Sequence, residues 1–62
     1  MNWYAYKLTT GKVIAKQHSR KTQREINDLY ADDNVLDVIE DIEAENEKKA
    51  IKKAKEEFNQ DV

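Results

Sequence analysis

Residues 3–16, WYAYKLTTGKVIAK, carry the clearest structural signal in the chain. Aromatic and β-branched residues crowd its two ends, and such residues favour β-strands. Between them lies Gly11, the only glycine of the protein, which supplies the positive φ that a tight turn needs. Since no Asn-Gly pair is present, a type I turn with Gly11 as the bulge residue fits best. The sequence therefore predicts a β-hairpin over residues 3–16.

Alternation along the two strands gives the predicted hairpin two faces. One face carries Tyr4, Tyr6, Leu8 and Ile14. The opposite face carries Trp3, Ala5, Val13 and Ala15. A slip of one residue in the pairing would exchange the faces of one strand, so these assignments depend on the register.

A short helix is predicted over residues 22–31. Thr22 and Glu25 have the spacing of a capping box, in which each side chain accepts from a backbone amide at the start of the helix. Ile26, Leu29 and Tyr30 follow at the i, i+3 and i+4 positions of one helix face. The helix should end at residues 32–34, because Asp-Asp-Asn favours turns and caps.

A long C-terminal helix is predicted over residues 34–58. Its apolar stripe consists of Val35, Ile39, Ile42, Ala50, Ala54 and Phe58. Asn46 falls in the middle of this stripe, where an apolar residue is expected. An asparagine there fixes the register or oligomeric state of paired helices, or else the core ends near Ile42 and Asn46 is solvated. Both interpretations stay open.

Length and composition predict one α+β domain spanning residues 1–62, paired as a homodimer. A chain of 62 residues buries a small core and usually needs reinforcement. With no cysteine and one histidine, neither disulfides nor a His/Cys zinc site provides it. A second subunit or a well-packed long helix remains as the source, and of the two we expect a homodimer. The residues expected in the core or dimer contact are Tyr6, Leu8, Ile14, Ile39, Ile42, Asn46 and Phe58.

The charges are divided into blocks along the chain. Residues 1–24 hold six basic residues and no acid, residues 25–47 hold ten acids and no base, and residues 48–62 hold five lysines and three acids. The net charge of −2 conceals this segregation. Block charge of this kind is typical of an interaction surface or of a solvated face.

The acidic block predicts a surface that imitates nucleic acid. On the predicted long helix, Asp37, Asp41 and Glu45 are four residues apart, about 6 Å per step. A row of carboxylates at this spacing competes with a phosphate backbone for a basic protein. The alternative is that the acids serve helix capping and solubility. The candidate binding residues are Asp32, Asp33, Asp37, Glu40, Asp41, Glu45 and Glu47.

Two other functions are compatible with the same pattern. The basic, aromatic hairpin could bind nucleic acid directly, by stacking and phosphate contacts. Its candidate residues are Trp3, Tyr4, Lys7, Lys12, Lys16, Arg20, Lys21 and Arg24. The neighbouring acids and the absence of overall basicity count against this interpretation. Alternatively, the basic hairpin of one subunit pairs with the acidic segment of another, and the protein is a structural subunit.

No catalytic or metal-binding pattern is present. His18 is the only histidine, and no serine, cysteine or carboxylate is tied to it in a recognisable motif. A packed or solvent-facing His18 is expected. The acids at residues 32–37 lack the glycine and the glutamate spacing of a calcium loop. We therefore expect a binding protein without cofactor, metal, substrate or membrane partner, and not an enzyme.

The acidic run over residues 25–47 and the small hairpin-and-helix frame resemble the compact, cysteine-free phage proteins that inhibit host machinery, among them acidic DNA mimics. The resemblance implies a basic DNA-binding protein as the partner. It assigns no role to an individual residue. The cytoplasm is expected as the location on other grounds, namely the lack of cysteine, of a signal-peptide pattern and of a long apolar run.

Overall fold

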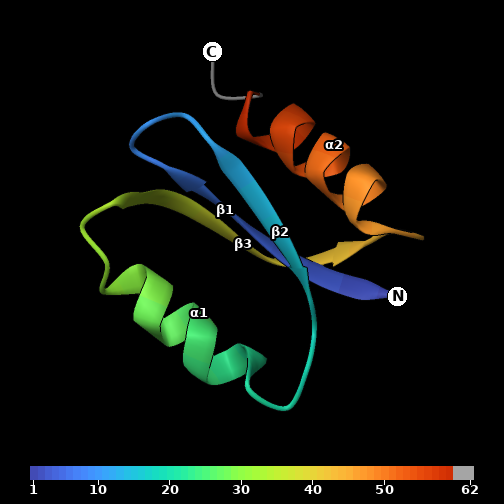
Figure 1. Ribbon diagram of the computed structural model, residues 1–62, viewed down its shortest axis with the longest axis horizontal. Coiled ribbons are helices and arrows are strands. Elements are labelled where there is room, and N and C mark those ends of the chain that lie inside the picture. The colour runs from blue at the N-terminus through green and yellow to red at the C-terminus, as the bar shows by residue number, and fades with distance from the viewer. Residues whose placement is uncertain (60–62) are drawn as a thin grey trace.

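The computed structural model describes residues 1–59 as three strands and two helices (Figure 1). In chain order the elements are β1 (Asn2–Leu8), β2 (Val13–Gln17), α1 (Thr22–Tyr30), β3 (Val35–Glu43) and α2 (Glu47–Phe58). The strands form one antiparallel sheet in the order β2-β1-β3. The predicted α+β class, the hairpin and the short helix are thus confirmed.

The hairpin has the predicted register. Tyr6 lies opposite Ile14, and Ala5 lies opposite Ala15. Gly11 has a φ of +92°, and its N–H donates to the Leu8 carbonyl at 2.8 Å. The positive φ that the turn requires is therefore supplied by the one residue without a Cβ.

The predicted long helix over residues 34–58 is wrong in its first half. Residues 35–43 form β3, which pairs with β1, and α2 begins only at Glu47. Val35, Val38, Ile39 and Ile42 have the i, i+3, i+4, i+7 spacing of a helix face. They have this spacing on a strand because β3 contains two irregularities that break the simple alternation of faces.

Each irregularity inserts an extra residue into β3. Trp3 and Ala5 are two residues apart on β1, whereas their partners Ile42 and Ile39 are three apart on β3. This β-bulge puts Ile39 and Ile42 on the same face of the sheet. A second bulge lies between the partners of Lys7 and Leu8 and leaves Leu36 as the extra residue.

Asn46 is the N-cap of α2 and not a member of a helix seam. Its Oδ1 accepts from the Lys49 N–H at 2.9 Å, and its backbone is extended. An asparagine in this position satisfies one of the amides that the first helical turn leaves without a partner, and losing it costs about 1 kcal/mol. The side chain is exposed.

The predicted capping box of α1 is also corrected. Thr22 Oγ1 accepts from the Ser19 N–H at 2.6 Å, and Ser19 Oγ accepts from the Lys21 N–H at 3.3 Å. Lys21 is the N-cap of α1 and its side chain makes no capping hydrogen bond, so the predicted capping box is not formed and these two bonds belong to the turn before the helix. The Glu25 side chain does not cap the helix and instead accepts a hydrogen bond from the Tyr4 hydroxyl.

The two helices cover opposite faces of the sheet, as Figure 1 shows. The face that carries Trp3 packs against α2, where Ala50 and Ala54 have no exposed surface and allow a close approach to the strands. Trp3 Nε1 also donates to the Ala44 carbonyl at 3.0 Å. Tyr4 points to the other face, toward α1, and its hydroxyl reaches Glu25 there.

The core differs in part from the predicted set. Ile42 is buried, and Tyr6, Leu8, Ile14, Ile39 and Phe58 are half-buried. The buried apolar residues are Trp3, Tyr4, Ala5, Ala15, Ile26, Ile42, Ala44, Ala50 and Ala54.

Within residues 1–59 no helix is long and apolar enough to cross a membrane.

Candidate protein-binding surface

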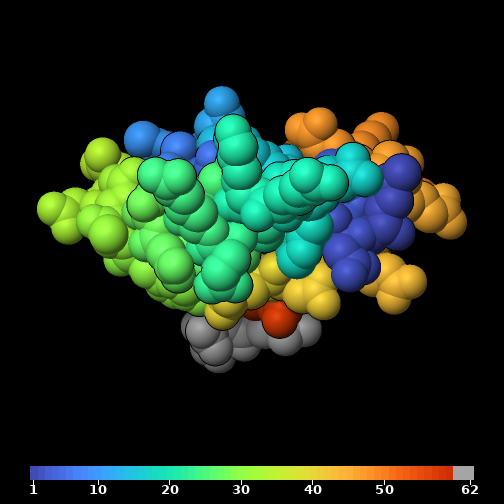
Figure 2. Space-filling view, turned by 90° about the horizontal axis from the view of Figure 1, so that it is seen from below, coloured from blue at the N-terminus to red at the C-terminus, as the bar shows by residue number. Residues whose placement is uncertain are grey.

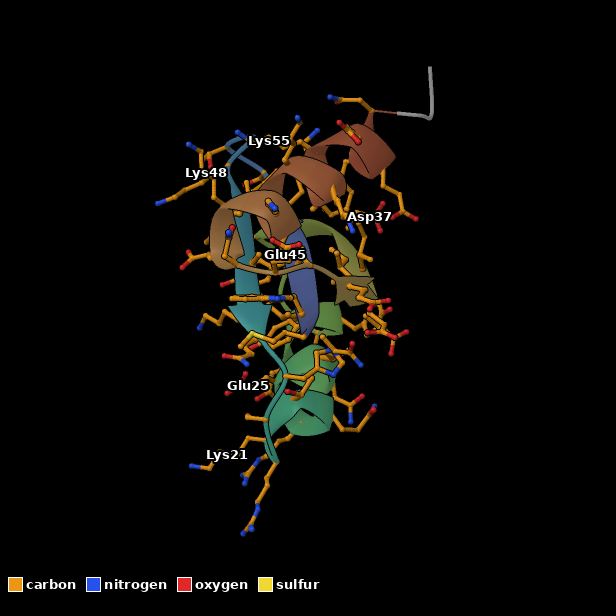
Figure 3. All side chains as sticks on the ribbon, turned by 90° about the vertical axis from the view of Figure 1, so that its right-hand side faces the viewer. Lys21, Glu25, Asp37, Glu45, Lys48 and Lys55 are labelled. Atoms are coloured by element: carbon orange, nitrogen blue, oxygen red, sulfur yellow. The ribbon has the colours of Figure 1, made fainter. Side chains whose placement is uncertain are left out.

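Most of the predicted acidic residues lie along β3 and its flanking turns instead of along one helix, and Glu47 is the first residue of α2. β3 is an edge strand, since among residues 1–59 it pairs with β1 alone. Its exposed carboxylates are Asp37, Glu40, Asp41 and Glu43, which we call the acidic edge. Asp32 and Asp33 precede the strand, whereas Glu45 and Glu47 follow it. Figure 3 shows Asp37 on the β3 side of the molecule and Lys48 and Lys55 on the β2 side.

Glu43 belongs to this surface although the sequence analysis did not select it. A helical arrangement separates Glu43 from the row of Asp37, Asp41 and Glu45, whereas a strand brings it into line with Asp41. The missing signal was the β-branched content of residues 35–43, which favours a strand.

The acidic edge has no cationic partner within the described part of the chain. The one ion pair in residues 1–59 joins Lys49 Nζ to Glu45 Oε2 at 2.7 Å, and both side chains are exposed. Glu45 is thus engaged by α2, at the start of the helix. The four carboxylates of the acidic edge remain available to an external cation.

The backbone of β3 is partly occupied by side chains of the protein itself. The Val38 N–H donates to Asp37 Oδ1 at 2.8 Å, and Lys53 Nζ donates to the Glu43 carbonyl. Together with the two bulges, these contacts make the edge a poor template for another strand. A partner would therefore contact the side chains of the acidic edge and not extend the sheet.

Glu40 is held in place from the α1 side. The Tyr30 hydroxyl donates to Glu40 Oε2 at 3.1 Å, and His18 Nε2 lies 2.8 Å from the Glu40 carbonyl. Since a carbonyl only accepts, the Nε2 of His18 carries a hydrogen. The His18 ring is packed 6.0 Å from that of Tyr4. The bulge that exposes Glu40 is therefore fixed by two side chains from outside β3.

Two tyrosines have a raised pKa. Burial, followed by the hydrogen bond to Glu25, raises the pKa of Tyr4 far above its usual value. The hydrogen bond to Glu40 raises the pKa of Tyr30, and the charges of Glu40 and Asp37 act in the same direction. Both hydroxyls therefore remain protonated donors at neutral pH.

The predicted nucleic-acid surface of the hairpin is not assembled. Trp3 and Tyr4 are 8% and 1% exposed, so neither ring is available to stack on a base. Lys7 lies opposite Val13 and Lys16 lies opposite Tyr4, which places the two lysines on opposite faces of the hairpin. Lys12 is in the hairpin turn, whereas Arg20 and Lys21 precede α1 and Arg24 lies on it.

No group of three or more histidine, cysteine or acidic side chains in residues 1–59 has an arrangement that could hold a metal ion.

No family model matches the chain, and neither the comparison with curated proteins nor that with solved structures gave a match. The arrangement of charge and apolar surface is thus the basis for a functional proposal.

Proposed function

We propose that this protein binds a basic partner protein through the acidic edge and competes there with nucleic acid. The observation that carries the proposal is the run of four exposed carboxylates between Asp37 and Glu43, none of which has a cationic partner in the described chain. At about 3.3 Å per residue, successive carboxylates are on average about 7 Å apart. One DNA strand carries a charge every 3.4 Å or so. The acidic edge therefore carries about half as many negative charges per unit length as one DNA strand.

Edge protection alone does not account for this number of acids. Natural edge strands are blunted by a bulge, a charge or a covering element. Here β3 already has two bulges, and the Val38 amide is occupied by Asp37. Glu40, Asp41 and Glu43 are additional to these devices. An uncompensated row of like charge is unfavourable to the fold and is useful to a cationic partner.

The same charge opposes the alternative of direct nucleic-acid binding. A phosphate backbone would be repelled by the acidic edge, and the rings of Trp3 and Tyr4 are buried. Assembly by sheet extension through β3 is disfavoured by the occupied backbone of that strand.

A homodimer fits this proposal through the opposite edge of the sheet. β2 is a five-residue edge strand, and in the described part of the chain it pairs with β1 alone. Two-fold pairing of β2 with its copy would give a continuous sheet with one acidic edge at each end. Such a dimer would present two binding surfaces and reinforce the small core.

A competition assay tests the proposed function. A fluorescein-labelled DNA duplex is first bound by a lysine-rich DNA-binding protein, and the present protein is then added. We expect the duplex to be displaced, with a potency that falls as the salt concentration rises. Absence of displacement at low salt would contradict the proposal. Binding of the free duplex by the present protein would favour the nucleic-acid alternative instead.

A further inference from the structure

An exposed apolar patch lies beside the acidic edge. Tyr30 and Leu36 are 60% and 62% exposed, and within residues 1–59 only Met1 is a comparably exposed large apolar side chain. Both residues line a single hollow of about 150 Å³, together with Leu29, Val35, Asp37 and Val38. Residues of α1 and β3 form its walls. Exposed apolar surface concentrated in one place typically marks a site of interaction.

The exposure of Leu36 follows from the fold. Leu36 is the extra residue of the bulge between Lys7 and Leu8, where β3 has one residue more than β1. Bulges redirect a side chain, and this one leaves a leucine in solvent where it adds little to the core. In Figure 2 the turn before β3 and the end of α1 form a protruding end of the molecule, in yellow-green.

The opposite wall of the hollow is held by a hydrogen bond. The Tyr30 hydroxyl donates to Glu40 Oε2, which ties the end of α1 to the acidic edge. The aromatic ring thus has a defined position although most of it is exposed. A fixed aromatic ring beside an apolar hollow is a common anchor in protein interfaces, because little side-chain entropy is lost on binding.

Charge around the hollow selects its occupant. Asp37 lines the hollow itself, and Glu40 is bonded to Tyr30. Asp32 and Asp33 lie in the turn that joins α1 to β3. The hollow is open to solvent, and its volume is similar to that of an enclosed cavity of about 150 Å³ that holds benzene in another protein. The best fit is one apolar side chain presented between cationic residues.

We propose that the hollow between Tyr30 and Leu36 is the anchor point of the binding surface, and that it accepts a leucine-sized or phenylalanine-sized side chain from a lysine-rich or arginine-rich segment of the partner protein. This inference rests on the proposed function and adds a requirement that nucleic acid does not meet. The acidic edge selects cationic segments, and the hollow selects those among them that carry an apolar residue.

Two synthetic peptides test the anchor. Both are lysine-rich and equal in charge, and one has a central leucine where the other has serine. We expect the full chain to bind the leucine peptide about tenfold more tightly, which corresponds to about 1.4 kcal/mol. Leu36→Ser should abolish this preference without weakening binding of the serine peptide, whereas Leu36→Met should retain it. Circular dichroism checks that each variant is folded.

The outcomes separate the two proposals. Equal affinity of the wild-type protein for both peptides would overturn the anchor and leave the charge-based function in place. A leucine preference that persists in Leu36→Ser would place the anchor elsewhere and likewise overturn it. If neither peptide binds at low salt, both the proposed function and the anchor fail.

Discussion

Trp3→Ala is expected to remove about a third or more of the free energy of unfolding of the protein. Trp3 is 8% exposed, packs in the cluster between the sheet and α2, and donates to the Ala44 carbonyl at 3.0 Å. Truncating a buried tryptophan to alanine costs about 3–5 kcal/mol. A domain of 62 residues has a total stability of roughly 3–9 kcal/mol. The loss is therefore at least about a third of the free energy of unfolding of the fold.

Urea titration followed by far-ultraviolet circular dichroism measures this loss, because the variant has no tryptophan fluorescence. Trp3→Phe is the matched control, since it keeps an aromatic ring in the cluster but removes the donor to Ala44. We expect its unfolding midpoint to lie between those of the wild type and Trp3→Ala. A midpoint for Trp3→Ala equal to that of the wild type would mean that Trp3 is not in the core.

Neutralising the acidic edge is expected to weaken partner binding by about 10- to 100-fold. The variant combines Asp37→Asn, Asp41→Asn and Glu43→Gln. Exposed ion pairs contribute about 0.2–1 kcal/mol each, and pairs desolvated in an interface contribute more. Asparagine at position 37 retains an oxygen that can accept from the Val38 N–H, so the edge keeps its local structure. The competition assay with the lysine-rich protein gives the affinity.

A control with the same change in net charge locates the effect. Asp28→Asn, Glu56→Gln and Glu57→Gln alter exposed acids on α1 and α2, outside the acidic edge. We expect this variant to lose less than threefold in affinity, which corresponds to about 0.6 kcal/mol. An equal loss in both variants would show that net charge, and not the acidic edge, determines binding.

The hairpin and α1 could be predicted because their signals are local. The alternation of residues 3–8 and 13–15, together with Gly11, is sufficient to specify two faces and a turn. The division between β3 and α2 depends on non-local pairing. Only the partner strand β1 determines where the bulges of β3 fall, and the bulges give its apolar residues a helical spacing. The N-cap role of Asn46 was a local signal that indicated where α2 begins.

The candidate surface was predictable in composition and not in geometry. The acid-only block at residues 25–47 is evident from the sequence. Its position on a sheet edge requires β3, and so does the inclusion of Glu43. The burial of Trp3 and Tyr4, which removes the aromatic part of the nucleic-acid alternative, follows from the two helices covering opposite faces. The exposure of Leu36 requires knowledge of the second bulge.

The position of the binding surface can be measured directly by nuclear magnetic resonance. The isotopically labelled protein is titrated with the unlabelled lysine-rich DNA-binding protein, and the amide shifts of each residue are followed. We expect the largest changes in residues 36–43 and at the end of α1, with small changes in α2. Changes concentrated in α2 or in the hairpin turn would show that the acidic edge is not the surface that meets the partner.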